Sequence, residues 1–299
     1  MKIITKVCII VSGVFLVIGA ICLSVGVAMG VTPSQLLHHN INFGNFFTNS
    51  TSTPLESDSL SETHTFTDIK SLDFDLSLCE LTIYQHESDD LLLTADNTSF
   101  YFSCTQEEDQ LIIKDDRPAS TMQDSMKQAL KLTLYLSKEE IEDIDINIDV
   151  GEISIEKLSA EHIKFNCGVG DFQAEEFFCE DLGLSCGVGE IEIARLFCED
   201  TAIMEVGTGN ILLNQYQGPS LDITSGVGET TIMVAGDETD YNYTLNASLG
   251  EIYLNHHHFS KSHDSDFATC LEKDYNADQD IQIQNGLGNI NLTFMEESL

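Results

Sequence analysis

The most regular feature of the chain is an alternation of apolar and polar residues that pairs of glycines interrupt. Between residues 143 and 295 a short phrase recurs, in which two glycines separated by one residue precede an acidic residue or Asn. Clear copies are GVGD at 168–171 and GVGE at 187–190. Alternating positions continue on both sides of the phrase, and a period of two is typical of β-strands with one buried face.

The second glycine of the phrase marks a repeat of about 19 residues. These glycines are Gly151, Gly170, Gly189, Gly209, Gly228, Gly250 and Gly288. One pair of short strands cannot bury its own apolar face, so repeats of this kind stack into a continuous core. We therefore predict an all-β fold, a parallel β-solenoid with 19–20 residues per rung. The last step, of 38 residues, indicates a degenerate copy or an insertion between 251 and 287.

Alignment of the copies predicts five columns of buried side chains that run through the stack. The central column consists of Ile146, Phe165, Leu184, Met204, Ile223, Leu245 and Ile283. The other four columns begin at Ile144, Ile148, Ile153 and Ile155. Stacked parallel strands lie about 4.8 Å apart, so we expect Leu184 to contact its column neighbours in the adjacent rungs.

The region before the repeats also has strand-like patterning, but without glycine pairs. Residues 72–83 carry the same five columns, and four further alternating runs follow, at 90–95, 100–105, 110–114 and 130–136. We predict that residues 66–142 form an N-terminal β cap, because a solenoid needs a cover for its open end. Residues 143–295 then form the solenoid, with an insertion near 255–280.

The N-terminus carries a long apolar segment. Residues 7–31 contain no charged residue and are long enough to span a bilayer as a helix. Lys2 and Lys6 precede the segment, which places the tail of residues 1–6 in the cytoplasm and the rest of the chain outside. We predict a signal anchor; a cleaved signal peptide is the alternative, although its apolar region usually has only 7–15 residues. Residues 32–65, rich in Ser, Thr and Asn, form a linker.

The composition narrows the classes of function. The chain has 299 residues, 50 of them acidic and 13 basic, with a formal net charge of −37. This charge excludes a nucleic-acid-binding protein, because a phosphate backbone would be repelled. A hydrophobic content of 42% is sufficient for a packed core, so the chain as a whole is not disordered.

Two stretches resemble a known bacterial family. They are FTDIKSLDFDLSLCELTIYQ at 66–85, and LKLTLYL at 130–136 followed by IDINIDVGEISIEKLSAEHIKFNCGVGDF at 144–172. They are similar to the candidate-adhesin family of β-strand-repeat proteins, a domain of unknown function, over roughly 66–295. The resemblance implies a cell-envelope protein that one helix often anchors, encoded near envelope-stress or transcriptional regulators. It supplies no catalytic residues, and this chain lacks the extra helical membrane domain of some members.

The residue after the glycine pair is often acidic. The acidic copies are Glu152, Asp171, Glu190, Glu229 and Glu251. Stacked carboxylates repel one another, and Ca²⁺, which prefers oxygen ligands, would relieve the repulsion. The nine-residue period of calcium-binding β-rolls is absent, however, and Asn210 interrupts the column. We therefore assign no metal residue, and calcium remains a weak alternative to solvated carboxylates.

Cysteines and histidines offer two further constellations. Cys167 and Cys186 share a column, as do Cys179 and Cys198, which permits either disulfides or a buried thiol ladder. We prefer the ladder, since stacked parallel neighbours rarely offer the required dihedral angle. The run HHH at 256–258, with His263, resembles a metal cluster. It lies where the repeat breaks, so a solvated loop is the simpler interpretation.

Nothing in the repeats singles out a catalytic centre. The glycine pairs lead into strands, whereas a dinucleotide fingerprint requires a third glycine and a helix. We therefore predict a non-enzymatic, membrane-anchored cell-surface protein that binds an envelope or extracellular protein or glycan. No catalytic, cofactor or metal residues are assigned. A carbohydrate-active parallel β-helix enzyme is the alternative, because an inverting pair of carboxylates could exist among so many acids.

Overall fold

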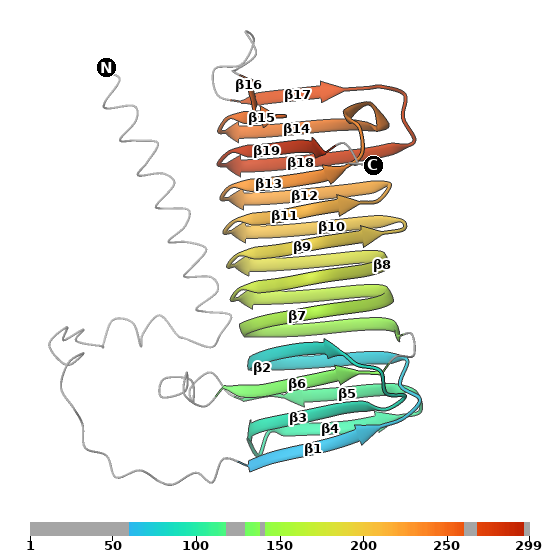
Figure 1. Cartoon of the computed structure of the whole chain (residues 1–299). Helices are drawn as coiled ribbons and strands as arrows, with labels where there is room; N and C mark the ends of the chain where they lie inside the picture. Colours follow the sequence, from blue (N-terminus) through green and yellow to red (C-terminus); the bar gives the residue numbers. More distant parts are fainter. Residues whose placement is uncertain (1–59, 118–128, 138–140, 260–267, 296–299) are drawn as a thin grey trace, which may run out of the picture. The chain divides into compact units, whose positions relative to one another are not determined.

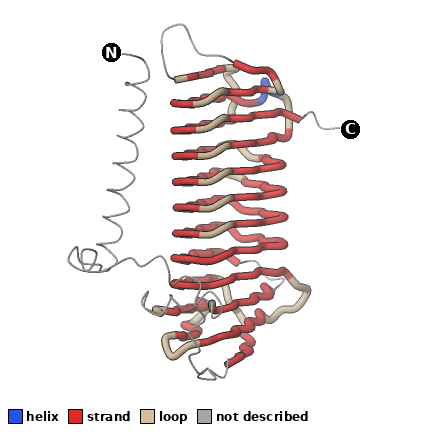
Figure 2. Tube along the Cα trace, turned by 90° about the vertical axis from the view of Figure 1, so that its left-hand side faces the viewer, coloured by secondary structure: helices blue, strands red, loops and turns tan. Residues whose placement is uncertain are grey.

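The computed structural model describes residues 60–117, 129–137, 141–259 and 268–295, which form a stack of β-strands (Figure 1). Nineteen strands join in one continuous hydrogen-bonded ladder, and most pairs between rungs are parallel. A single turn of 3₁₀ helix, η4 (Glu238–Asp240), lies between two of the strands. The predicted all-β fold is confirmed, and Figure 2 shows the rungs stacked one above another.

The strands divide into three groups along the chain. The first group is β1 (Leu60–Phe66), β2 (Ser71–Gln85), β3 (Leu91–Thr98), β4 (Phe102–Glu107), β5 (Gln110–Asp115) and β6 (Leu130–Leu136). The second is β7 (Ile141–Val169), β8 (Phe172–Val188), β9 (Ile191–Cys198), β10 (Thr201–Thr208), β11 (Ile211–Gln217), β12 (Ser220–Val227) and β13 (Thr230–Ala235). The third is β14 (Tyr241–Leu249), β15 (Ile252–Leu254), β16 (His257–Phe259), β17 (Thr269–Lys273), β18 (Gln279–Leu287) and β19 (Ile290–Met295).

The predicted columns are confirmed by the strand register. Leu184 of β8 pairs with Phe165 of β7 on one side and with Met204 of β10 on the other. Met204 in turn pairs with Ile223. All four side chains are buried, and the other four columns are buried as well. Burial of apolar surface along these ladders is the main stabilising contribution to the fold.

Glycine is required where each rung turns, along a line that we call the glycine edge: Gly151, Gly170, Gly189, Gly209, Gly228, Gly288, Gly250 and the residues that flank them. A Cβ atom at Gly189 would lie 1.8 Å from the carbonyl oxygen of Gly170 in the rung below. Its φ of 152° is also strained for other residues. Backbones of successive rungs therefore meet so closely at this edge that no side chain fits between them.

The order of the rungs changes near the C-terminal end. β12 pairs with β18 rather than with β14, and β13 pairs with β19. β14 and β15 lie on the far side of β18 and β19. The last rung along the chain is thus inserted between two earlier ones (Figure 1). Two short strands, β16 and β17, pair in antiparallel fashion with β15 and β14. Both lie within 255–280, where the sequence predicts an insertion.

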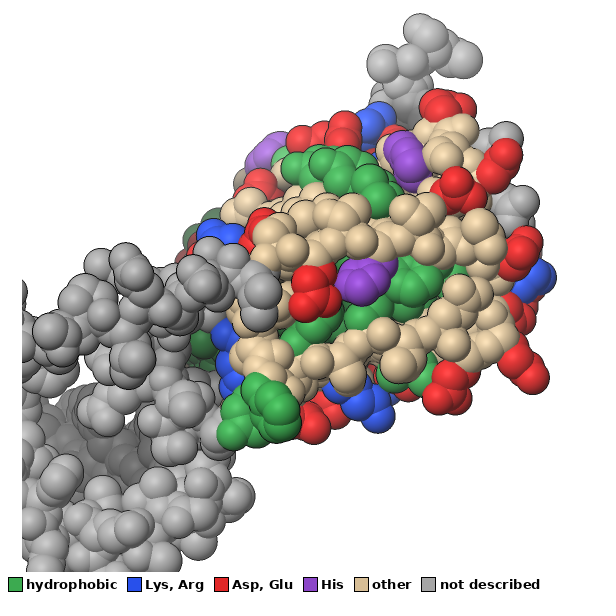
Figure 3. Space-filling model, turned by 90° about the horizontal axis from the view of Figure 1, so that it is seen from below, with side chains coloured by type: hydrophobic (Ala, Val, Ile, Leu, Met, Phe, Trp, Pro, Cys, Tyr) green, Lys and Arg blue, Asp and Glu red, His purple; other side chains and the backbone are tan. Residues whose placement is uncertain are grey.

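The N-terminal end is closed differently. β2 pairs in parallel with β7 on one side and with β5 and β6 on the other. β4 and β3 then add in antiparallel fashion, and β1 pairs with β3. Seen from this end, acidic side chains and a few basic ones lie around the rim, and hydrophobic side chains show at the centre between tan-coloured polar side chains and backbone (Figure 3). On β1, the half-buried side chains of Glu62 and His64 face this end, with His64 Nε2 3.2 Å from Glu62 Oε2.

The predicted membrane anchor lies outside the described residues. In the ranges that the structure describes, no helix is both long and apolar enough to cross a membrane. The anchor at 7–31, the tail at 1–6 and most of the linker at 32–65 remain predictions from the sequence.

Candidate functional site

A groove of about 1100 Å³ opens where the rung order changes. We call it the switch groove. Its lining residues are Phe197, Cys198, Glu199, Gln217, Gly218, Pro219, Ala235, Gly236, Asp237, Thr239, Asp240, Tyr241, Ala277, Asp278 and Gln279. They belong to the edge opposite the glycine edge, where β9, β11 and β13 end and where β14 and β18 begin.

The groove is a consequence of the inserted rung. The turns on this edge between β7 and β13 join neighbouring rungs, whereas residues 236–240 pass from β13 over β18 and β19 to reach β14, and residues 274–278 pass from β17 over β14 to reach β18. A two-rung step is about 10 Å, which five residues span easily. Backbone bonds tie both sides of the passage, from Gly236 N to Met295 O at 3.0 Å and from Asp280 N to Pro219 O at 2.8 Å. The two connections therefore form walls that regular rungs do not have.

Carboxylates dominate the chemistry of the switch groove. Glu199, Asp237, Asp240 and Asp278 are all exposed at its walls. The fifteen lining residues include no Lys, Arg or His. The lining also contains the buried Tyr241, whose hydroxyl donates to Ala235 O at 3.3 Å. Burial, together with the charge of Asp240, raises the pKa of this phenol. The groove therefore combines concentrated negative charge with a few apolar lining residues, among them Phe197, Pro219 and Ala235.

A hydrogen-bonded clasp fixes one wall of the groove. The carboxylate of Glu238, in η4, accepts bonds from Tyr243 Oη at 2.6 Å and Tyr275 Oη at 2.8 Å. Its second oxygen accepts from Asn255 Nδ2 at 2.8 Å. Burial and the neighbouring Glu238 raise the pKa of Tyr243, which keeps this phenol a donor. The connection between β13 and β14 is therefore held in place by residues that follow it in the chain.

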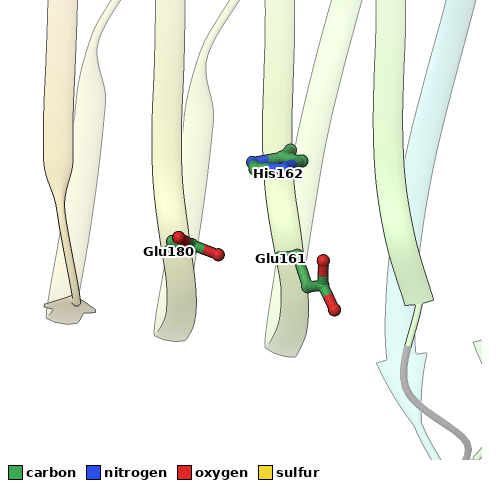
Figure 4. Close-up of side chains that lie close together, drawn as sticks. All are labelled: Glu161, His162 and Glu180. Carbon is green, nitrogen blue, oxygen red and sulfur yellow. The ribbon is translucent and has the colours of Figure 1, made fainter.

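The same edge carries a smaller group of possible metal ligands. Glu161, His162 and Glu180 offer ligand atoms that lie within 4.8 Å of one another. Glu180 lies on the strand beside the one that carries the other two, and its carboxylate points toward them (Figure 4). All three are exposed, and His162 Nδ1 lies 3.2 Å from Asp181 Oδ2. The 19-residue repeat places Glu161 beside Glu180, so the signal was present in the sequence. The sequence analysis nevertheless missed the group and assigned no metal ligand here.

The acidic column predicted on the glycine edge does form, but in a different order from the chain. Its members in space are Glu152, Asp171, Glu190, Asn210, Glu229, Asn289 and Glu251. Asp171 Oδ1 accepts the backbone N–H of Glu190 at 2.9 Å. The amide oxygens of Asn210 and Asn289 accept those of Glu229 and Glu251, each at 3.0 Å. These oxygens therefore have a structural role, because each accepts a backbone N–H of the adjacent rung.

An exposed apolar column accompanies the acids and was not recognised in the sequence. It consists of the residues between the paired glycines, and Val188 is typical, with half of its surface exposed. The other large members are Val169, Val227, Leu287 and Leu249. The motif itself was the available signal, because its central residue is Val in three of the copies.

The predicted cysteine register is confirmed. Cys167 pairs with Cys186 and Cys179 with Cys198, and all four thiols are buried. Each thiol also approaches a backbone carbonyl, the closest being Cys198 Sγ to Glu180 O at 3.1 Å. In the described part of the chain the cysteines are free thiols. This arrangement is the buried ladder.

The histidine run lies at the C-terminal end of the stack. His257 and His258 belong to β16 and are exposed, as is His256. His258 Nε2 lies 3.6 Å from Glu251 Oε2, and its ring lies 5.2 Å from that of Tyr253. His263 falls outside the described residues. His256 therefore lies in an exposed turn, close to the solvated loop that the sequence suggested, whereas His257 and His258 lie in a strand with exposed side chains.

Comparison with known proteins extends the description. Solved structures similar to the chain include a candidate cell adhesion protein from Clostridium sporogenes, 14% identical, with 79% of this chain and all of the other covered, at a TM-score of 0.36. A candidate adhesin from Bacteroides fragilis is 14% identical over 80% of this chain and 98% of the other, at 0.48. One from Parabacteroides merdae is 13% identical, with coverages of 79% and 96%, at 0.43.

No curated protein is detectably similar in sequence to the chain. A family model does match, and it spans residues 69–293. This range begins just before β2 and ends within β19, so it covers the solenoid and almost all of the cap. The chain belongs to the Toastrack DUF4097 family.

Proposed function

We propose that the chain is a non-enzymatic binding protein of the cell surface, and that it takes a basic protein segment in the switch groove. The observation that carries this proposal is the set of four carboxylates around one groove whose lining has no basic residue. The groove also lies where two connections skip a rung, whereas the glycine edge repeats similar features many times. Recognition of one partner requires such a break in symmetry.

The chemistry of the groove favours a cationic ligand. Four carboxylates at the walls attract Lys and Arg side chains, and a net charge of −37 raises the local concentration of any basic partner. The apolar parts of Phe197 and Pro219 suit the aliphatic stems of the same side chains. A basic segment of protein fits better than a neutral glycan, which would leave these charges without partners.

The experiment compares two variants of equal net charge. In the groove variant, Glu199→Gln, Asp237→Asn and Asp278→Asn remove three charges; in the control, Glu152→Gln, Glu190→Gln and Glu229→Gln remove three from the glycine edge. Binding of a fluorescent oligolysine to the full chain in detergent is followed by anisotropy. Exposed ion pairs contribute about 0.2–1 kcal/mol each, so the groove variant should bind about tenfold more weakly. The control should change less than twofold.

Equal losses in the two variants would show that the probe senses total charge only, and the groove would then have no role in binding. The same samples are also assayed for release of reducing ends from cell-wall polysaccharide. Turnover that the groove substitutions abolish would replace the binding proposal with the carbohydrate-active alternative.

Attachment to the membrane is a separate part of the proposal. It is supported by the uncharged segment at 7–31 and by the lysines before it. The full chain should remain in the membrane fraction after an alkaline wash, and protease added outside intact cells should digest the solenoid. A chain without residues 7–31 should leave the membrane fraction. Recovery of the intact chain in the soluble fraction would exclude an anchor.

A further inference from the structure

The inserted rung belongs to a unit that holds together by its own contacts. We call the unit the C-terminal module; it consists of η4 and β14–β19. Within it, β14 pairs with both β17 and β18, and β15 pairs with both β16 and β19. The Glu238 clasp and the rings of Tyr241, Tyr243 and Phe294 lie inside the same unit.

One junction connects the module to the earlier rungs, and we call it the seam. It consists of β12 against β18, from Ser220 opposite Asp280 to Val227 opposite Leu287, and of β13 against β19. Parallel strand pairing at the seam has the same register as between any two rungs. It differs in that the two sides are linked only through residues 236–240.

The seam is the most polar junction in the core. Among described residues with buried polar side chains, Ser225, Thr230 and Asn285 all lie at this junction. Thr230 Oγ1 donates to Asn285 Oδ1 at 2.9 Å, and Asn285 Nδ2 donates to Gly228 O at 3.3 Å. At other junctions the same columns contain Val, Ile, Phe and Cys. Buried polar pairs select one register and one partner, but they stabilise less than apolar packing does.

The connection across the seam contains a pivot. Gly236 has a φ of 113°, which glycine adopts without strain. Asp237 then bonds to Asp240 Oδ2 through its N–H at 3.1 Å, and the clasp ties the next residue, Glu238, to the module. Rotation at 236–237 would therefore carry the module as a whole away from β12 and β13. An element joined by a short hinge to a matching edge is the arrangement from which domain exchange arises.

We propose that the C-terminal module undocks at the seam and docks onto β12 and β13 of a second copy, so that two chains exchange modules. The partner is a second copy because the edge of β12 and β13 already matches β18 and β19 along both strands. The exchanged dimer uses the same hydrogen bonds and the same Thr230–Asn285 pair as the closed chain. Since two copies of charge −37 repel each other, exchange should increase with ionic strength.

The test uses Thr231, which faces outward between two register neighbours. Leu212 lies beside it on the sequential side, and Asn291 lies beside it across the seam. One copy carries Thr231→Cys; the second, labelled with ¹⁵N, carries either Asn291→Cys or, as the matched control, Leu212→Cys. All copies carry Cys270→Ser, which removes an exposed thiol. The full chains are mixed in detergent at several concentrations and salt levels and treated with a short thiol crosslinker.

Mass spectrometry then identifies links between a labelled and an unlabelled copy. We expect the mixed link from 231 to 291 to increase with concentration and to exceed the link from 231 to 212 at least tenfold. A single chain with both Thr231→Cys and Asn291→Cys should form the link internally, which verifies that the substituted chains fold. Absence of the mixed link at every concentration and salt level, or equal yields for 291 and 212, would overturn the proposal.

Discussion

The two halves of the solenoid differ in the order in which their rungs are stacked. From 143 to 235, each rung lies next to the rung that precedes it in the chain. From 241 to 295 the order is reversed: the last rung, β18 and β19, lies between the rung of β12 and β13 and the rung of β14 and β15. The repeats of both regions share the second glycine of the phrase and the same columns. The comparison teaches that the repeat specifies the shape of a rung, whereas the position of the rung in the stack depends on what its neighbours offer.

The glycine edge supplies a physical reason for the altered order. From Glu152 to Glu251 in space, Glu alternates with Asp or Asn, and each short side chain accepts a backbone N–H from the next Glu. In chain order, Glu251 would follow Glu229 directly. Two carboxylates would then be stacked, and the N–H of Glu251 would lose the acceptor that Asn289 provides. Insertion of the last rung restores both the alternation and the hydrogen bond.

A charge placed in the core should unfold the two regions to different extents, and this is the largest effect on stability that we expect. Leu184→Asp leaves an unpaired carboxylate where the side chain is 3% exposed. The cost is several kcal/mol, comparable to the whole stability of a domain, so thermal unfolding by circular dichroism should show no folded baseline. Ile283→Asp, in the same column, should release only the C-terminal module and leave the signal of the earlier rungs. Identical behaviour of the two variants would remove the distinction.

Substitution of glycine should separate inner from outer rungs, with a smaller effect. At Gly209 a Cβ would lie 1.7 Å from Gly189 O, and φ is 146°. Positive φ alone costs about 1–3 kcal/mol, and here rungs on both sides prevent relaxation. Gly209→Ala should therefore lose about 3 kcal/mol or more in urea unfolding. Gly250→Ala meets a similar carbonyl, at 1.9 Å, but the φ of Gly250 lies outside the positive range that strains other residues, so it should lose less.

The control for this series is Gly183→Ala. A Cβ there would lie 3.9 Å from the nearest atom, Lys164 Cγ, so the substitution should be neutral or slightly stabilising. A loss at Gly183 as large as at Gly209 would mean that glycine is needed for general flexibility rather than for close approach of the rungs.

Much of the fold follows from the sequence, because its signals are local. The period of two, the glycine spacing and the apolar columns predict every rung from β7 onward, together with β2. The altered order of the last two rungs could not be predicted from these signals, since both orders bury the same columns. The acidic residue after each glycine pair held the missing information. Its alternation becomes visible only when the repeat of Gly288 is placed before that of Gly250.

The candidate site was less accessible to prediction. The sequence directed attention to 255–280, where the repeat breaks. The switch groove combines residues from four stretches of the chain, from Phe197 to Gln279, and the spatial neighbours on its walls depend on the rung order. The sequence could have supplied only the acidity of its residues, in a chain where acids are common everywhere. The groove is therefore a property of the topology rather than of any motif.

The polar pair at the seam should matter more for specificity than for stability. Asn285→Ala removes the partner of Thr230 and leaves buried groups unsatisfied, which costs about 1–3 kcal/mol. The double variant Asn285→Leu, Thr230→Val replaces both partners with apolar groups and should recover most of that loss in urea unfolding. A double variant no more stable than Asn285→Ala would mean that the seam does not tolerate apolar packing.

The smallest expected effect concerns the position of the first glycine, which Asp149 and Ser248 occupy in the end repeats of the glycine series. Partial burial, followed by the charge of Asp75, raises the pKa of Asp149 above 3.8. The folded state then holds this proton more tightly than the unfolded state, so the ionised group destabilises the fold above the raised pKa and has no effect below about pH 3.8. Asp149→Asn should stabilise the protein at pH 7 by about 0.5 kcal/mol or less. The gain should vanish as the pH falls to 3.5, as measured by urea unfolding at both pH values against Asp222→Asn, which makes the same charge change elsewhere. Equal responses of the two variants would mean that the effect depends on total charge alone. A gain confined to Asp149→Asn would show that a side chain at the first glycine position, which occurs only at the ends of the glycine series, has an electrostatic cost.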